Sequence, residues 1–258
     1  MTKVKLKELT KYFTRGYRGS FKKDGKDVSL SNLDYDFYFN KRIHNDNNWY
    51  CMNISSLLNN KILTVYKIDG YYRELSKFKI ENNDIILPLI GRNYRPIYID
   101  NMFPYINDDF KSNINLIITN NLSILEVDEK IVNPKYIVSV LDSKEIQEYI
   151  KNNLKGKRTK VLSEETLMDI EIPIIEDEKM DEEGKAYIKK EKEIGEPLNT
   201  FAEAINENVN LKDIINVSLI LFKKNEELRD MTNENAVQEI KKFLKDNISI
   251  GGGSNESI

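Results

Sequence analysis

The sequence predicts a mixed-sheet α/β (α+β) domain over residues 1–175, a charged helical region at 176–250 and a flexible tail at 251–258. Two observations support this organisation. Up to residue 175, apolar runs of strand length alternate with short segments of helical spacing. Beyond it the composition becomes acidic, and apolar residues recur only at helical spacing, at 211–222 and 237–248. A first charged helix is expected from residue 184, with Gly195 and Pro197 ending it.

Segment 131–174 combines two short helices, a basic loop and an extended exit. Pro134 can open the first helix because the first helical position needs no N–H, and Ser143 can cap the second. Ser163 caps a further short turn before the exit. Between the second helix and that turn, six residues carry four cations around one glycine: Lys155, Gly156, Lys157, Arg158 and Lys160. We expect this loop to bind a polyanion.

Two other polar loops carry similar chemistry. The loop at 14–20 contains two glycines together with Arg15, Tyr17 and Arg18, which suit phosphate and base contacts. An ordinary exposed loop is the alternative interpretation. The loop after the apolar run 85–90 consists of Arg92, Asn93, Tyr94 and Arg95. Arginine pairs with guanine and asparagine with adenine in the major groove, so this loop suits base readout; a plain hairpin loop is again the alternative.

The remaining segments predict further strands, short helices and turns. Residues 1–13 read as a strand running into a turn of helix, and 52–66 as a short helix followed by a strand. The run 85–90 is apolar on both faces and predicts a buried strand, in which Pro88 indicates an edge or an irregularity. Asn120 and Asn121 form a turn or hold a base edge, and we favour the turn. The aromatic residues of 35–50 are core residues or stack on bases, and we favour the core.

The order of these pieces resembles the target recognition domain of type I restriction-modification specificity subunits and of related type IIG-like single-chain enzymes. The resemblance rests on the helix start at 133–136, the polar loop around Gly156 and the ending at 162–173. It rests also on a turn and strand at 78–91, with Asn83 where the family usually has glycine. The family's P-P-L-x-E-Q start of the docking helix is absent.

The resemblance implies a non-catalytic domain that reads one half-site of double-stranded DNA. Catalysis and the methyl donor would then belong to a DNA methyltransferase subunit, and no cofactor is expected in this chain. A single such domain would form a homodimer or pair with a second recognition domain. The helical region following the domain would dock on the partner.

The charge distribution fits this expectation. The whole chain has a net charge of −3, but residues 1–160 carry 27 Lys and Arg against 19 Asp and Glu, a balance of +8. Residues 161–258 carry 12 against 23, a balance of −11. We expect a basic front that meets phosphates and an acidic back that meets a protein.

Several other functions are not supported by the sequence. One cysteine, Cys51, and one histidine, His44, make zinc sites and Ser-His-Asp or Cys-His catalysis improbable. The stretch 133–136 resembles an amino-methyltransferase box with lysine in place of its second proline, and no glycine-rich loop for the methyl donor precedes it. No catalytic or metal residue is therefore proposed. The charged start and the lack of a long apolar run predict a cytoplasmic protein without a membrane span.

These observations predict a sequence-specific specificity subunit, or half-subunit, of a restriction-modification complex that acts in DNA methylation and phage defence. Two alternatives remain. The chain could be the specificity part of a single-chain methyltransferase-nuclease. It could also be an interaction protein or decoy, of phage or host, that reuses the fold and binds a protein through its acidic half.

Overall fold

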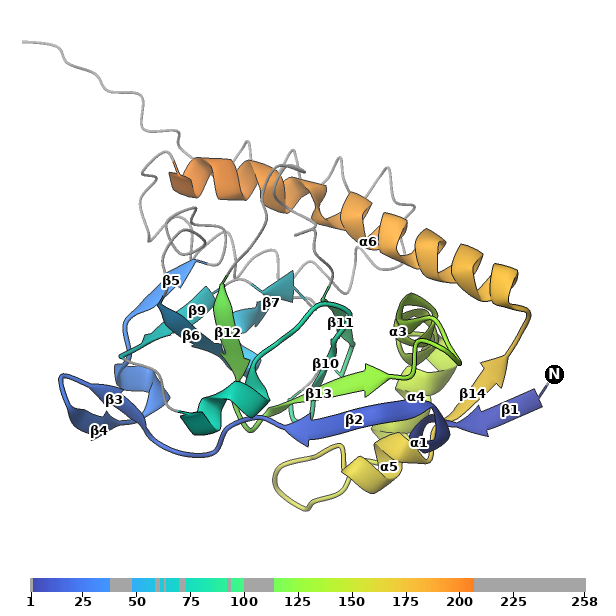
Figure 1. Cartoon of the computed structure of the whole chain (residues 1–258), viewed down its shortest axis with the longest axis horizontal. Helices are drawn as coiled ribbons and strands as arrows, with labels where there is room; N and C mark the ends of the chain where they lie inside the picture. The colour runs from blue at the N-terminus through green and yellow to red at the C-terminus, as the bar shows by residue number, and fades with distance from the viewer. Residues whose placement is uncertain are drawn as a thin grey trace, which may run out of the picture.

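The fold is α+β, with strands and helices mixed along the chain (Figure 1). A computed structural model describes residues 2–37, 48–58, 61–62, 64–69, 73–91, 94–99 and 114–206. Two four-stranded sheets lie next to each other, and the helices gather around the one that contains the first long strand. A long helix runs along the upper side in this view. The expected helices at 211–222 and 237–248, and the tail, lie outside the described residues.

The central sheet is antiparallel and has the strand order β11 (Ile97–Tyr98), β10 (Ile85–Pro88), β13 (Leu122–Val127) and β2 (Thr10–Arg15). All four residues of β10 are buried, which confirms the strand predicted from its apolar run. Strand β11 pairs only with Ile85 and Ile86, so Pro88 has β13 as its single neighbour. Proline donates no hydrogen bond, and it stands where the strand has a free side, as predicted.

The second sheet has the order β12 (Asn115–Ile118), β6 (Trp49–Met52), β9 (Thr64–Ile68) and β5 (Tyr35–Phe37), with β12 parallel to β6. Two hairpins accompany it, β3 (Phe21–Lys23) with β4 (Lys26–Val28) and β7 (Leu57–Leu58) with β8 (Lys61–Ile62). Three 3-10 turns connect the strands: η1 (Leu30–Asn32), η2 (Ile54–Ser56) and η3 (Arg73–Phe78).

The helix expected after Met52 is only the 3-10 turn η2. The Asn53 side chain accepts hydrogen bonds from the N–H groups of Ser55 and Ser56, at 2.8 and 3.1 Å, and so caps this single turn. Leu57 then leaves it in an extended conformation. Among the aromatic residues, Tyr50 is buried, in agreement with the core interpretation.

The three helices of segment 131–174 start where the sequence predicts. Helix α3 (Pro134–Leu141) has Pro134 in its first turn and is capped by Asn133. Helix α4 (Lys144–Asn152) is capped by Ser143, and α5 (Glu164–Met168) by Ser163, each hydroxyl accepting a backbone N–H. Strand β14 (Glu171–Ile174) follows and pairs with β1 (Thr2–Lys5), so the start of the chain lies beside this exit. Helix α1 (Leu6–Leu9) links β1 to β2.

Strand β10 of the central sheet is buried on both faces. Ile85 and Leu87 pack in a cluster with α3, α4 and α5, whereas Ile86 packs in a second cluster with residues of the other sheet. Successive side chains of a strand point to opposite faces, so a strand covered on both sides needs a continuous apolar run. This explains why the alternation expected of a half-exposed strand is missing in 85–90.

Helix α6 (Asp177–Asn206) is longer than the sequence predicts. It begins within the acidic run and continues through Gly195 and Pro197, where an end was expected. A proline inside a helix removes one backbone hydrogen bond and does not always end the helix. Gly184 lies against α3 so closely that an added Cβ would be 2.8 Å from the Lys135 Cβ. The first half of α6 therefore packs on the domain rather than extending away from it.

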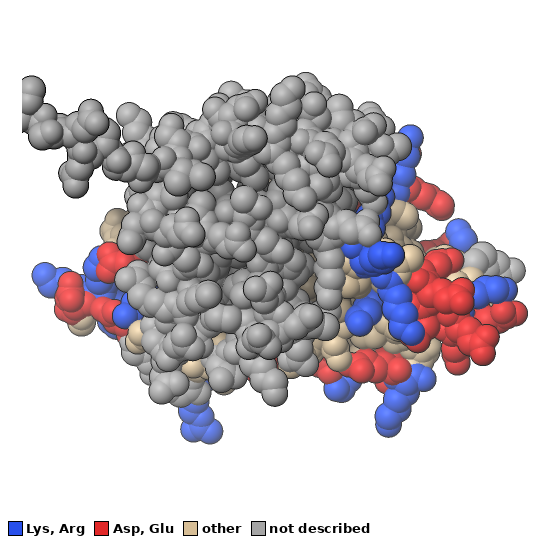
Figure 2. Space-filling model, turned by 90° about the horizontal axis from the view of Figure 1, so that it is seen from above, with Lys and Arg blue, Asp and Glu red and all other residues tan. Residues whose placement is uncertain are grey.

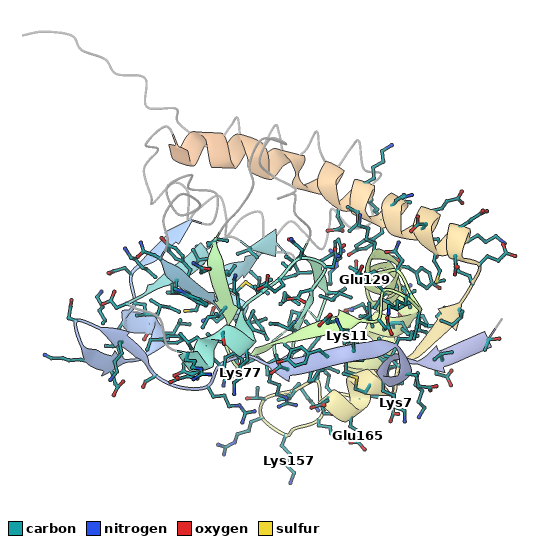
Figure 3. The ribbon with its side chains drawn as sticks, in the orientation of Figure 1. Lys7, Lys11, Lys77, Glu129, Lys157 and Glu165 are labelled. Carbon is teal, nitrogen blue, oxygen red and sulfur yellow. The ribbon has the colours of Figure 1, made fainter. Side chains whose placement is uncertain are left out.

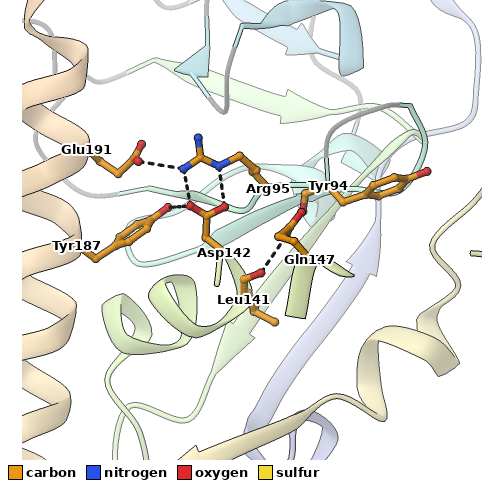
Figure 4. A network of polar contacts seen from close by, with 7 residues as sticks. All are labelled: Tyr94, Arg95, Leu141, Asp142, Gln147, Tyr187 and Glu191. Carbon is orange, nitrogen blue, oxygen red and sulfur yellow. Dashed lines mark hydrogen bonds and ion pairs between the residues drawn. The ribbon is translucent and has the colours of Figure 1, made fainter. Parts of the chain in front are cut away.

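A buried charged network fixes α6 to the domain (Figure 4). The Arg95 Nε donates to Asp142 Oδ1 at 2.6 Å, and its Nη2 donates to Asp142 Oδ2 and, at 3.1 Å, to Glu191 Oε1. The Tyr187 hydroxyl donates to the same carboxylate at 3.1 Å. Burial alone would lower the pKa of Arg95, but hydrogen bonding and the charge of Asp142 raise it. The guanidinium stays charged and joins the β10–β11 connection, the α3–α4 junction and α6.

Asp142→Ala should lower the free energy of unfolding by about 3–5 kcal/mol, because it leaves Arg95 buried without its main partner. Denaturant unfolding measures this loss. Glu176→Ala is the matched control, since it breaks an exposed pair with Lys179 on the same helix and should leave stability nearly unchanged. Similar small effects of both substitutions would show that the network does not hold α6.

The turn before β10 contains a further buried carboxyl group, outside this network. Asn83 has φ +69°, a conformation that glycine adopts without strain and that asparagine tolerates. The next residue, Asp84, is 6% exposed and accepts the N–H of Glu81 at 2.7 Å. Burial raises the pKa of Asp84 to about 6 from its ordinary 3.8, against the lowering effect of this hydrogen bond.

Asp84→Asn should make the protein more stable at pH 7, by on the order of 2–3 kcal/mol. The raised pKa means that the folded state binds this proton more tightly than the unfolded state. The wild-type protein should therefore lose stability as the pH rises from about 4 through about 6, whereas the variant, which keeps the acceptor oxygen, should lack this loss. Unfolding measured between pH 4 and pH 8 tests this, and parallel profiles would contradict it.

Candidate nucleic-acid interface

One end of the central sheet brings the predicted loops together. Strands β2 and β10 each pair antiparallel with β13. Both therefore end at the end of the sheet where β13 begins. Backbone hydrogen bonds continue the pairing of these three strands beyond their ends: Gly16 N donates to Leu122 O at 3.0 Å, and Leu89 N donates to Asn121 O at 2.9 Å. Ile90 then forms a bridge with Val161. The loops at 14–20 and 155–160 and the start of the loop after β10 are thus neighbours in space.

The basic loop at 155–160 is a tight, hydrogen-bonded structure. Lys155 and Val161 exchange backbone hydrogen bonds of 2.9 and 2.8 Å across its base. Gly156 has φ +107°, and a Cβ there would lie 2.2 Å from the Thr159 carbonyl oxygen, so only glycine fits. The loop leaves its cations exposed: Lys155, Lys157, Arg158 and Lys160.

Tyr94 connects the loop after β10 to this basic loop. Its side chain is 2% exposed, and its hydroxyl donates to the Lys160 carbonyl oxygen at 3.2 Å. Arg95, next to it, points into the domain and binds Asp142 and Glu191 (Figure 4). The structure thus uses both residues for internal contacts, which the sequence pattern alone did not indicate. Arg92 and Asn93 lie outside the described residues.

The residues of the loop at 14–20 differ in their exposure. Thr14 and Arg15 belong to β2, so the loop begins two residues later than predicted, and Arg15 is half-buried. The Tyr17 ring packs edge-on against Phe21 and Phe78, with centroids 5.4 and 5.6 Å apart, and burial raises the pKa of its hydroxyl. Arg18 is exposed.

Further cations lie on the same side of the molecule. Figure 3 places Lys7 and Lys77 along the lower edge together with Lys157. Both are exposed, and Lys77 Nζ lies 5.0 Å from the centroid of the Phe78 ring. They are single cations within elements whose pattern indicates only packing, so no sequence signal distinguishes them from other surface lysines. Acidic groups are present too: Glu165, on the same edge, pairs with Lys155.

Metal binding and thiol chemistry find no support among the described residues. Among them no group of three or more histidine, cysteine or acidic side chains could hold a metal ion. Cys51 is buried and its burial raises the pKa of the thiol, which disfavours the thiolate needed for nucleophilic attack. Within the same residues, none of the helices combines the length and apolar composition needed to cross a membrane.

The chain is similar to solved structures of type I restriction-modification systems. One comes from work on complex assembly and conformational transition of such a system, with 8% identity over 86% of this chain and 45% of that chain, at a TM-score of 0.47. The S subunit from M. genitalium shows 16% identity over 80% and 42%, at 0.42. HsdS from Thermoanaerobacter tengcongensis shows 14% over 75% and 42%, at 0.45. The chain spans less than half of each. No protein-family model and no curated protein matches it.

Gly156→Ala should disorder the basic loop without unfolding the domain, because the methyl group would collide with the Thr159 carbonyl. Hydrogen exchange at the Lys155 and Val161 amides should become at least about tenfold faster. Gly25→Ala is the matched control: Gly25 also has a positive φ, but nothing lies within 4 Å of its added Cβ. Unchanged exchange in Gly156→Ala would mean that the loop is not held by this contact.

Proposed function

We propose that this chain binds double-stranded DNA with the end of the central sheet and reads a short sequence there. The observation that carries the proposal is the basic loop at 155–160. It presents exposed cations on a backbone fixed by Gly156, the Lys155–Val161 pair and the Tyr94 hydroxyl. A loop fixed before binding loses little conformational entropy when it meets phosphates.

We assign phosphate contacts to the exposed cations and base readout to the loop after β10. Lys157, Arg158 and Lys160 bind phosphates and orient the domain. Arg15 and Arg18 bind phosphates on the other side of β13. Arg92 and Asn93 read base edges. Tyr94 and Arg95 support the site from within, because their polar groups already bind Lys160, Asp142 and Glu191.

The cellular role we infer is that of a specificity subunit in a restriction-modification system. This inference rests on the ordered motifs at 133–136 and 162–173, whose helix start and exit strand the structure contains. A DNA methyltransferase subunit would supply catalysis. A second recognition domain, or a second copy of this chain, would read the other half of a split target.

A second candidate is an interaction protein that binds through its acidic side. Exposed carboxylates gather just before α6 and on its first turns: Glu176, Asp177, Glu178, Glu182 and Glu183. Figure 2 shows acidic side chains concentrated at this end of the molecule. Helix α6 lies on the side away from the basic loop, so a protein bound there would not compete directly for the loop (Figure 1).

Lys157→Ala should weaken binding to all duplexes alike, since phosphates carry no sequence information. The logarithm of wild-type affinity should fall linearly with the logarithm of salt concentration, and the substitution should reduce the magnitude of that slope by about 1. Lys189→Ala, an exposed lysine on α6, is the control and should match the wild type. Absence of duplex binding by the wild-type chain at low salt would contradict the proposal and favour the second candidate.

A further inference from the structure

The turn between β12 and β13 occupies the middle of the proposed interface. Strand β13 lies between β10 and β2 in the sheet, so the turn that precedes it lies between the loops that follow those two strands. Thr119 forms a bridge with Tyr17 on one side, and Asn121 O accepts the N–H of Leu89 on the other. A side chain on this turn therefore lies between the arginines of 15–18 and the basic loop.

The turn is rigid. Leu122 N donates to Thr119 O at 2.9 Å and closes it, while Thr119 N donates to Met52 O and Asn120 N to Tyr17 O, both at 2.9 Å. These bonds tie it to both sheets and to the loop at 14–20. Below it, Gly16 lies so close that an added Cβ would be 2.3 Å from Thr119 O. The backbone at its tip is thus held in place before any ligand binds.

Asn120 has no structural task at this position. Asparagine is favoured in turns because it tolerates positive φ or because its side chain bonds nearby backbone groups. Among the described residues other than glycine, only Asp24 and Asn83 have positive φ. Asn53 and Asn133 use their side chains as helix caps. Asn120 does neither: it is exposed, and no described residue forms a hydrogen bond with its amide group.

A second polar group at the turn is also unused. The Thr119 hydroxyl is buried, and it is the only buried side-chain oxygen or nitrogen among the described residues that lacks a hydrogen-bond partner. Unsatisfied buried groups are rare and tend to mark places where water or a ligand completes the hydrogen bonding. The turn thus carries an exposed amide and an orphaned hydroxyl.

We propose that Asn120 is a specificity-determining residue that reads an adenine edge in the major groove. This proposal rests on the proposed function. A carboxamide accepts from adenine N6 and donates to N7 at the same time, which no other base edge allows in that arrangement. The major groove is about 12 Å wide, so a narrow turn can enter it while the loops at 14–20 and 155–160 contact phosphates beside it.

The test is selection of bound duplexes from a pool with randomised base pairs, using the full-length chain. The wild type should prefer A·T at one or more positions. Asn120→Ala should reduce that preference at one position by about 5- to 150-fold while keeping the affinity for unselected duplex and its salt dependence. Asn82→Ala is the matched control, because Asn82 is likewise an exposed turn asparagine but precedes β10 at the opposite end of that strand.

A second variant distinguishes loss of the base contact from disruption of the turn. Asn120→Asp keeps the shape of the side chain but replaces the donor, and should shift the preferred base pair toward one that offers cytosine N4. Unchanged preference in both variants, or a wild-type chain that binds duplex without base preference, would overturn this inference and leave DNA binding intact. A wild-type chain that binds no duplex would overturn the proposed function as well.

Discussion

The buried Arg95 guanidinium is the interaction on which the arrangement of this molecule depends. It joins three elements that are far apart in sequence, and the side chains of its partners Asp142 and Glu191 are even less exposed than its own. Removing such a charge from water is costly, and only several well-placed partners offset that cost. The connection between β10 and β11 is held by a further contact. Gln147, on α4, donates from its side-chain amide to the Tyr94 carbonyl oxygen at 3.3 Å. A loop that looks like a recognition loop is therefore partly a structural support.

Binding and support are divided between neighbouring residues at this end of the sheet. Tyr94 points inward and holds the Lys160 carbonyl, whereas the charged side chains of 157, 158 and 160 are exposed. The backbone row that connects Gly16, the turn at 119–122 and Leu89 gives the interface a fixed frame. A frame of backbone hydrogen bonds leaves side chains free to vary, which suits the proposed task of distinguishing sequences.

Charge separates the two sides of the molecule. The basic loop and Lys77 occupy one edge, and the carboxylates at the start of α6 occupy the other side (Figures 1 and 3). Acidic residues in a first helical turn also interact favourably with the helix dipole, so part of this cluster has a local explanation. Because the carboxylates of this cluster are exposed, they also repel phosphates. Under the proposed function, this separation would let DNA and a protein partner approach from different directions.

Short-range features of the fold were determined by the sequence itself. Asn133, Ser143 and Ser163 cap helices because capping involves residues within three positions of one another, and the run 85–88 is buried because it is apolar on both faces. The tertiary structure alone decided the roles of Tyr94 and Arg95 and the position of Asn120 between the loops. These roles depend on partners between 32 residues away (Leu89 and Asn121) and 103 residues away (Tyr17 and Asn120). In a sequence, an exposed loop arginine and a buried one are written with the same letter.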